Sequence, residues 1–326
     1  MTVRKPGPRH AVIATCTLSI RDAGDADALL ANGVELIDDM AREAERQGWS
    51  PDIMALPEHF ALPPGSKAHE TAEELDGRTV TAVAERARAH GCYIVVPMYV
   101  RDGEQVHNSA VLLDRAGEPV GVYHKVFPVV LEDDTVEGGQ TPGREFPVFE
   151  ADFGRVGIQI CWDVVFDDGW EAYAAQEAEL VIFTSAAPGI SLLISHAYRY
   201  QYYIAGSVMR PPSPIIDPLG LIVSQSSANR EVAVARVDLD YRVMPSRYLW
   251  EREGQVKEKY GDAINWNWHS AESGCLMTSS DPAMPIGKFI EVEDMMTMKE
   301  WVAYNRKRIA EERGGPPVMP PATQGS

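Results

Sequence analysis

Val156-Gly157-Ile158-Gln159-Ile160-Cys161-Trp162-Asp163 is the stretch of sequence on which the fold assignment depends. Its apolar residues alternate with Gly157 and Gln159 up to Cys161, and this period-two pattern is typical of a half-buried strand. An acidic run then precedes the helix-forming residues 169–175, and acidic side chains favour the positive end of a helix dipole. Cys161 is therefore predicted at a strand-to-helix turn, where nucleophile elbows expose a reactive atom. The alternative is a small buried hydrophobic residue, as most free cysteines are.

Strands and helices alternate outward from this stretch. Strands are predicted over residues 11–20, 52–56, 92–100, 107–114, 119–125, 156–161, 180–184, 204–209 and 231–239. Helices are predicted from Asp25 to Gly48, with an apolar stripe of Leu30, Val34, Ile37, Ala41 and Ala44, and over 79–90, 169–175 and 192–203. Because a hairpin (107–125) interrupts the alternation, we expect an α/β protein with mixed sheets between helical layers, not a simple doubly wound sheet.

The composition of the chain excludes several classes of function. The 326 residues are 45% hydrophobic and 24% charged, and the formal net charge of −18 repels nucleic acid and anionic lipid. The four cysteines form no C-x-x-C pair, so the sequence predicts neither a disulfide framework nor a zinc site. No run approaches the ~18 apolar residues of a membrane span. We expect a cytoplasmic protein with no membrane or nucleic-acid partner.

The apolar run 11–20 follows three basic residues and superficially resembles a signal peptide. It contains Thr15, Thr17 and Ser19 and lacks a convincing small-residue cleavage site. We therefore interpret it as a first buried strand.

The composition changes near Tyr241, where an aromatic-rich extension begins. A helix is predicted over 292–312, and the proline- and glycine-rich tail is predicted to be disordered. The expected domains are a catalytic domain (1–240), an extension that packs on that domain or on a partner subunit (241–312), and a disordered tail (313–326).

Three polar residues follow apolar strands: Glu58 after Leu56-Pro57, Lys125 after Tyr123-His124, and Cys161. Strand ends on one side of a sheet are where α/β proteins assemble sites. A carboxylate that takes the thiol proton, and an ammonium that stabilises the thiolate and a developing oxyanion, would suit nucleophilic catalysis. Taken singly, Glu58 and Lys125 could equally be solvated surface charges.

These three stretches, in this order, resemble the nitrilase superfamily of carbon–nitrogen hydrolases. Two further segments match the family: Glu177-Ala178-Glu179-Leu180-Val181 leading to Ser185-Ala186, and Ile215-Ile216-Asp217-Pro218-Leu219-Gly220. The resemblance covers residues 10–240 and implies an α-β-β-α sandwich without a metal or other cofactor. It assigns Glu58 as base and acid, Lys125 to the tetrahedral intermediate and Cys161 as nucleophile. The main-chain N–H of Trp162 would share the oxyanion, and members commonly form homodimers or higher homo-oligomers.

Many members of the family carry a second glutamate between the lysine and the cysteine. Glu137, ahead of a glycine-rich turn, is our preferred match, and Glu132 is the alternative because its distance from Lys125 is nearer to that of true nitrilases. Asp163 is typical of amidase-like branches, whereas nitrilases commonly have Glu there.

An arginine that follows the cysteine motif in many amidase and carbamoylase members is absent here, which argues against substrates that bear a carboxylate. Arg199 or Arg210 could substitute, although a structural role is expected for both.

The resemblance predicts a hydrolase that cleaves small amide or carbamoyl substrates through a cysteine acyl-enzyme. The alternatives are a nitrilase, an acyltransferase and a non-catalytic binding subunit. His59, His69 and His107 do not form a metal-ligand spacing with nearby acids, and no metal site is expected.

Overall fold

A computed structural model describes residues 8–18, 25–246, 249–269 and 274–317. The chain divides into two compact units, Arg9–Leu239 and a second unit that contains the described residues from Asp240 onward.

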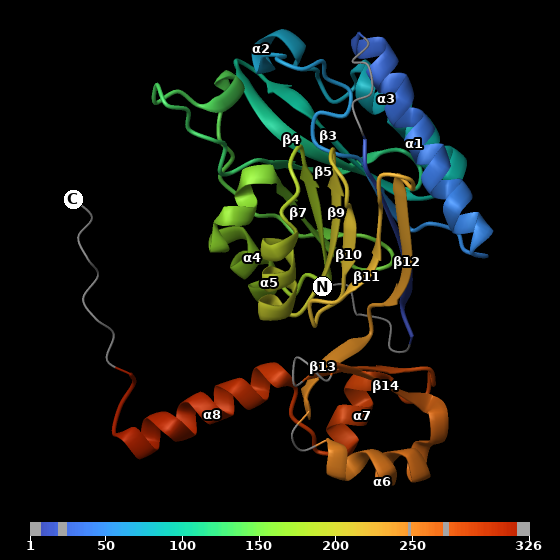
Figure 1. Cartoon of the computed structure of the whole chain (residues 1–326), viewed down its shortest axis with the longest axis vertical. Coiled ribbons are helices and arrows are strands. Elements are labelled where there is room, and N and C mark those ends of the chain that lie inside the picture. The colour runs from blue at the N-terminus through green and yellow to red at the C-terminus, as the bar shows by residue number, and fades with distance from the viewer. Residues whose placement is uncertain (1–7, 19–24, 247–248, 270–273, 318–326) are drawn as a thin grey trace. The chain divides into compact units, whose positions relative to one another are not determined.

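Two six-stranded sheets form the framework of the first unit (Figure 1). The strand order is β12-β1-β2-β3-β4-β5 in one sheet and β11-β10-β9-β8-β7-β6 in the other. The first sheet contains β1 (His10–Cys16), β2 (Ile53–Ala55), β3 (Tyr93–Asp102), β4 (Gln105–Leu113), β5 (Pro119–His124) and β12 (Val232–Asp238). The second contains β6 (Phe149–Glu150), β7 (Arg155–Ile160), β8 (Leu180–Ser185), β9 (Tyr203–Val208), β10 (Pro214–Ile216) and β11 (Ile222–Gln225). In each sheet three central strands are parallel, β1-β2-β3 and β7-β8-β9.

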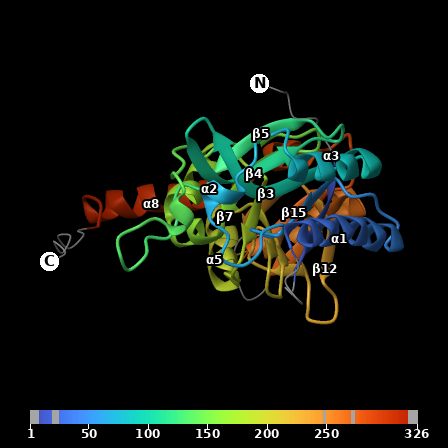
Figure 2. The same cartoon turned by 90° about the horizontal axis from the view of Figure 1, so that it is seen from above.

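Each sheet is covered on its outer face by a pair of helices. The helices α1 (Ala26–Arg46) and α3 (Arg78–His90) lie next to each other and share a buried apolar cluster with the first sheet (Figures 1 and 2). The helices α4 (Asp167–Ala175) and α5 (Ile190–Tyr200) share a cluster with the second sheet. The unit is therefore an α-β-β-α sandwich, and the predicted fold class is confirmed.

Small and hydroxyl side chains join the inner faces of the two sheets. The hydroxyl of Ser207 in β9 lies 2.8 Å from the carbonyl oxygens of both Cys16 and Ala55, which belong to the other sheet. Thr17 and Ser213 extend this buried seam, with their hydroxyls 2.8 Å apart. Because buried polar groups are costly unless paired, these hydrogen bonds favour one alignment of the sheets.

Most predicted elements of this unit are present, and the deviations have local causes. The first strand is buried, as expected, and lies between β12 and β2, but it ends at Cys16 instead of residue 20. Residues 19–20 lie outside the described part. The helix predicted over 192–203 ends at Tyr200, because Gln201 adopts a left-handed conformation (φ 58°) and Tyr203 already begins β9.

The stripe predicted for α1 is confirmed at Ile37, Ala41 and Ala44, and only its first two positions are displaced by one residue. Leu30 and Val34 are half-buried, and the fully buried positions are Leu29, Gly33, Leu36, Ile37, Met40, Ala41 and Ala44. The small residue Gly33 at the centre of this face allows the ring of Phe60 to approach the helix backbone.

The second unit contains a sheet that the sequence did not predict. Its strands are β13 (Tyr241–Pro245), β14 (Ile264–His269) and β15 (Gly274–Ser279), in the order β13-β15-β14. Helices α6 (Trp250–Tyr260) and α7 (Ile286–Val292) contribute to its apolar core.

The helix predicted over 292–312 is confirmed from Met298 onward as α8 (Met298–Arg313), but its predicted start was too early. Residues 293–297 separate α8 from α7, because Asp294 takes a positive φ of 49° and Thr297 caps α8. The predicted disordered tail overlaps α8 at Arg313, and residues 318–326 of that tail lie outside the described part. Among the described helices, none is both long and apolar enough to cross a membrane.

The contact between Gly33 and Phe60 yields a stability prediction. A Cβ at Gly33 would lie 2.6 Å from Cε2 of Phe60, whose ring is completely buried and cannot move aside. Glycine in a helix interior costs roughly 0.5–1 kcal/mol relative to alanine, but overpacking costs roughly 1–3 kcal/mol. We therefore expect Gly33→Ala to lower the free energy of urea unfolding by about 1–2 kcal/mol.

Gly254→Ala is the matched control, because Gly254 also lies within a helix, α6, and its Cβ would meet no atom within 4 Å. An increase in stability for Gly33→Ala would show that the Phe60 ring is not held against the helix.

Candidate active site

The three residues singled out in the sequence lie at the carboxyl ends of strands. Glu58 lies three residues beyond β2, Lys125 directly follows β5, and Cys161 directly follows β7. The strands β2 and β5 belong to one sheet and β7 belongs to the other. The site is therefore built from the carboxyl ends of strands of both sheets.

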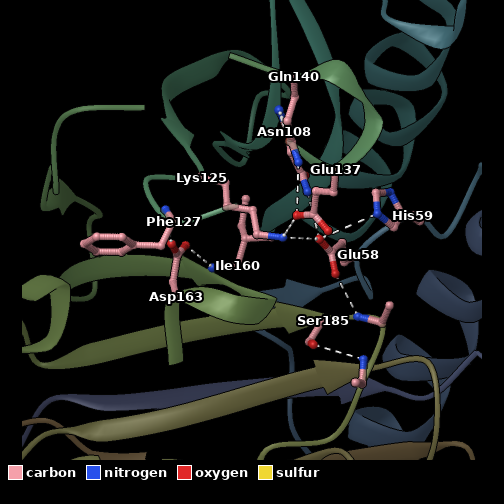
Figure 3. A network of polar contacts seen from close by, with 12 residues as sticks. Glu58, His59, Asn108, Lys125, Phe127, Glu137, Gln140, Ile160, Asp163 and Ser185 are labelled. Carbon is pink, nitrogen blue, oxygen red and sulfur yellow. Dashed lines mark hydrogen bonds and ion pairs between the residues drawn. The ribbon is translucent and has the colours of Figure 1, made fainter. Parts of the chain in front are cut away.

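The carboxylate of Glu58 is the most completely bonded group of the site (Figure 3). Its Oε1 accepts a hydrogen bond from Asn108 Nδ2 (2.8 Å) and one from Lys125 Nζ (3.3 Å). Its Oε2 accepts a hydrogen bond from the backbone N–H of Ala186 (2.9 Å), and His59 Nε2 lies 3.6 Å from Oε1. The side chain is only 2% exposed, so these contacts replace its hydration.

Lys125 bridges two carboxylates. Its Nζ lies 3.3 Å from Glu58 Oε1 and 2.5 Å from Glu137 Oε1, and its side chain is 1% exposed. Gln140 Nε2 donates a hydrogen bond to the same Glu137 oxygen (3.0 Å). Glu132, the alternative second glutamate, is exposed and makes no ion pair or side-chain hydrogen bond within the described part of the chain.

Two histidines that the sequence left without a role hold the loop that carries Glu137. His69 Nε2 lies 3.1 Å from the carbonyl oxygen of Gly139, and His107 Nδ1 lies 2.8 Å from that of Thr141. A carbonyl can only accept, so both imidazoles donate here. The loop is thereby fixed on both sides of Gln140.

Cys161 begins a 3₁₀ turn, η2 (Cys161–Val165), with a positive φ of 49°. A positive φ is uncommon for a residue with a Cβ and persists only where the surroundings enforce it. The thiol is partly buried, within hydrogen-bonding reach of Glu58 and Ser185. The N–H groups of a first helical turn have no intrahelical partner, so the N–H of Trp162 is suited to bind an oxyanion.

The surroundings of the site keep the thiol neutral and the carboxylate ionised. Burial and the nearby negative charge of Glu58 raise the pKa of the Cys161 thiol to about 12, although Lys125 and Ser185 oppose this. Burial would raise the pKa of Glu58, but Lys125, His59, Asn108 and the Ala186 N–H outweigh it and lower that pKa to about 2. Burial alone would lower the pKa of Lys125, yet its carboxylate partners and Cys161 raise it above the ordinary value.

Sequence reasoning missed Asn108 and Gln140, which donate hydrogen bonds to Glu58 and Glu137 respectively. Asn108 also donates its backbone N–H to Gln140 Oε1 (3.1 Å), so the two side chains are linked. A signal existed, because the polar run His107-Asn108-Ser109 interrupts an otherwise apolar strand and all three residues are buried.

The two arginines considered as possible carboxylate-binding residues are both exposed. Arg199 is exposed and donates to Asp167 (2.9 Å), which agrees with the structural role expected for it. Arg210 is exposed at the end of β9. No group of three or more His, Cys, Asp or Glu side chains arranged to hold a metal ion is found among the described residues.

Comparison with known proteins shows which family the chain matches. Residues 12–243 match the family described as carbon-nitrogen hydrolase. The chain is 26% identical over 231 residues to the omega-amidase NIT2 of Danio rerio, covering 62% of this chain and 81% of that protein. It is 30% identical over 218 residues to a nitrilase of Pyrococcus abyssi, covering 61% and 81% of the two chains.

A solved structure shares the fold. A mutant of the amidase from Nesterenkonia sp. AN1, with an acetamide moiety bound covalently at its active-site cysteine, superposes with a TM-score of 0.59 at 22% identity. The superposition covers 80% of this chain and 99% of the amidase. Because the family match spans most of the chain, this protein belongs to the carbon–nitrogen hydrolase family of the nitrilase superfamily.

Proposed function

We propose that this enzyme hydrolyses the C–N bond of a small amide or carbamoyl substrate through a Cys161 acyl-enzyme. The observation that carries the proposal is the convergence of one thiol, one buried carboxylate and one buried ammonium at the edges of two sheets. The omega-amidase relative and the covalently modified cysteine of the Nesterenkonia amidase support the same chemistry.

The first half of the reaction forms the acyl-enzyme. The sulfur of Cys161 attacks the carbonyl carbon while Glu58 takes the thiol proton. The oxyanion that develops is stabilised by the Lys125 ammonium and the Trp162 N–H. When the tetrahedral intermediate collapses, the nitrogen leaves with the proton from Glu58 as ammonia or an amine.

The second half releases the acid. Water attacks the thioester carbonyl and gives a proton to Glu58, and the second tetrahedral intermediate expels sulfur, which regains that proton. The acid product leaves and the starting protonation states return. In this scheme Glu137 does not touch the substrate; it holds the ammonium of Lys125 in place.

A substrate panel tests the proposal. Purified enzyme is given aliphatic amides, carbamoyl compounds and nitriles, and ammonia and the acid product are measured separately. We expect ammonia and acid from amides or carbamoyl compounds, and loss of all turnover in Cys161→Ala, because no other group at the site can form the thioester. Cys275→Ala is the control, since Cys275 is buried in the other unit.

Turnover by Cys161→Ala would exclude the mechanism. Turnover of nitriles alone would favour the nitrilase alternative, and a lack of turnover throughout the panel would favour a non-catalytic subunit.

The pKa shifts yield a prediction for Glu58→Gln. This change removes the base, so kcat/KM should fall by roughly 10²–10⁴-fold. It also removes the negative charge that helps raise the Cys161 pKa, while Lys125 remains. The thiol pKa should therefore fall below about 12, and iodoacetamide should label Cys161 at pH 7–9 at least as fast as in the wild type.

The doubly substituted Glu58→Gln/Cys161→Ala protein gives the background labelling. Retention of most activity in Glu58→Gln, or slower labelling at every pH, would contradict the assigned base.

The choice between the two glutamates is also testable. Hydrogen bonds to charged groups are worth roughly 1.5–3 kcal/mol, so loss of the Glu137 charge beside Lys125 should reduce kcat/KM by about 10- to 100-fold. Glu137→Gln, which alters the 2.5 Å contact with Lys125, is compared with Glu132→Gln. The second substitution is the same chemical change at an exposed position. A large loss in Glu132→Gln with none in Glu137→Gln would reverse the assignment.

We also infer that the enzyme is a homo-oligomer to which the segment from Tyr241 to Glu312 contributes. Trp250 is 67% exposed, and α8 buries none of its side chains while Val302, Tyr304 and Ile309 are exposed. Exposed large apolar groups of this kind are enriched in interface cores. Light scattering of the full chain at micromolar concentration should give at least twice the monomer mass, and a single monomeric species would refute the inference.

A further inference from the structure

Asp163 carries a buried carboxylate that the mechanism above does not use. Its two oxygens accept three hydrogen bonds, and Figure 3 shows how Ile160 and Phe127 lie against it. Oδ2 accepts hydrogen bonds from the Tyr123 hydroxyl (2.7 Å) and from the Ile160 N–H (3.0 Å). Oδ1 accepts a hydrogen bond from the Phe127 N–H (2.8 Å).

The bond to Ile160 closes the turn that presents the thiol. Ile160 is the last residue of β7, and the Asp163 side chain reaches back over Cys161 and Trp162 to its N–H. The residue spanned first, Cys161, has the positive φ of 49°. A strained backbone of this kind needs contacts that over-determine it, and this hydrogen bond is one of them.

The other two hydrogen bonds of Asp163 are donated by residues on both sides of Lys125. Tyr123 lies two residues before the lysine and Phe127 two residues after it. The Val126 N–H in turn lies 3.4 Å from the Tyr123 hydroxyl. The short segment that carries the ammonium is therefore wrapped around the carboxylate of Asp163.

These two sets of bonds connect different sheets. Lys125 follows β5 of the first sheet and Cys161 follows β7 of the second, and Asp163 is bonded to both connections. We propose that Asp163 is a positioning residue, whose carboxylate holds the thiol of Cys161 and the ammonium of Lys125 at the separation that the reaction requires. The inference rests on the proposed function, since it assigns a role for that same site.

The three donors require a carboxylate, not merely a polar side chain. An asparagine offers one oxygen and one NH₂ group, so either Phe127 or the Tyr123–Ile160 pair would face a donor. An unsatisfied buried N–H costs roughly 1–3 kcal/mol. The backbone segment that carries this N–H would therefore shift away from the asparagine. Burial raises the pKa of Asp163 to about 6 despite these donors, so the group is ionised at pH 8.

The test compares Asp163→Asn with Asp217→Asn. Asp217 is a matched control, because it is 1% exposed and its Oδ1 accepts from the N–H groups of Leu219 and Leu221, both at 2.9 Å. At pH 8, with the amide found in the substrate panel, we expect Asp163→Asn to lower kcat by about 10- to 100-fold with less than a threefold change in KM. Asp217→Asn, with a similar loss of thermal stability, should keep kcat within about threefold of wild type.

A second readout does not depend on turnover. In the Glu58→Gln protein the ammonium of Lys125 lowers the thiol pKa, so the pH midpoint of iodoacetamide labelling reports the distance between ammonium and thiol. Adding Asp163→Asn should raise that midpoint by about one pH unit, whereas adding Asp217→Asn should leave it unchanged. This result is obtained even if the substrate of the enzyme is not the one proposed.

Tyr123→Phe serves if Asp163→Asn does not fold, because it removes one of the three donors and keeps the carboxylate and both backbone N–H groups. It should lower kcat by a smaller factor, about three- to tenfold, in the same direction. Unchanged kcat and an unchanged labelling midpoint in a folded Asp163→Asn or Tyr123→Phe protein would overturn the inference. Turnover by Cys161→Ala would instead overturn the proposed function, so the two failures are distinguishable.

Discussion

The structure around the site depends on the burial of one ammonium, that of Lys125. A buried charge is costly unless it is paired and hydrogen-bonded, and Lys125 is 1% exposed. Two carboxylates, Glu58 and Glu137, therefore have to reach it from separate parts of the chain. Each carboxylate needs further donors in turn, and these come from Asn108, Gln140 and the Ala186 N–H. Because this one charge is buried, residues that lie far apart in the sequence have to be brought into contact around it.

The same arrangement explains how a carboxylate with a low pKa can serve as a base in the proposed reaction. Glu58 carries the negative charge at rest, and the Cys161 thiol is neutral. In that reaction the charge moves from Glu58 to the oxyanion when the thiol adds to a carbonyl, and Lys125, which pairs with Glu58 at rest, is the group assigned to stabilise the oxyanion. The net charge of the buried site does not change, so no step creates an unpaired charge in a region of low dielectric constant.

The sequence predicted regular elements well wherever short-range patterns determine them. The strand before Cys161, the helix ended by Gly91 and the hairpin of β4 and β5 follow from periodicity and from glycine at a left-handed position. The sheet of β13, β14 and β15 was missed, because two of its strands lie in segments whose aromatic content suggested only burial. The interruption between α7 and α8 was missed because the residues between them are not strong helix breakers; the Thr297 capping box starts a new helix there.

The sequence alone determined that Glu58, Lys125 and Cys161 each follow an apolar strand, because a strand and its end are recorded in neighbouring residues. With the resemblance to a known family it also determined the α-β-β-α fold. Only the tertiary structure placed Glu137 and not Glu132 beside Lys125, and only it brought Asn108 and Asp163 to their partners. Asn108 lies 50 residues from Glu58, and Asp163 lies 40 residues from Tyr123. Contacts over such separations depend on how the two sheets pack, and no local pattern of residues encodes that packing.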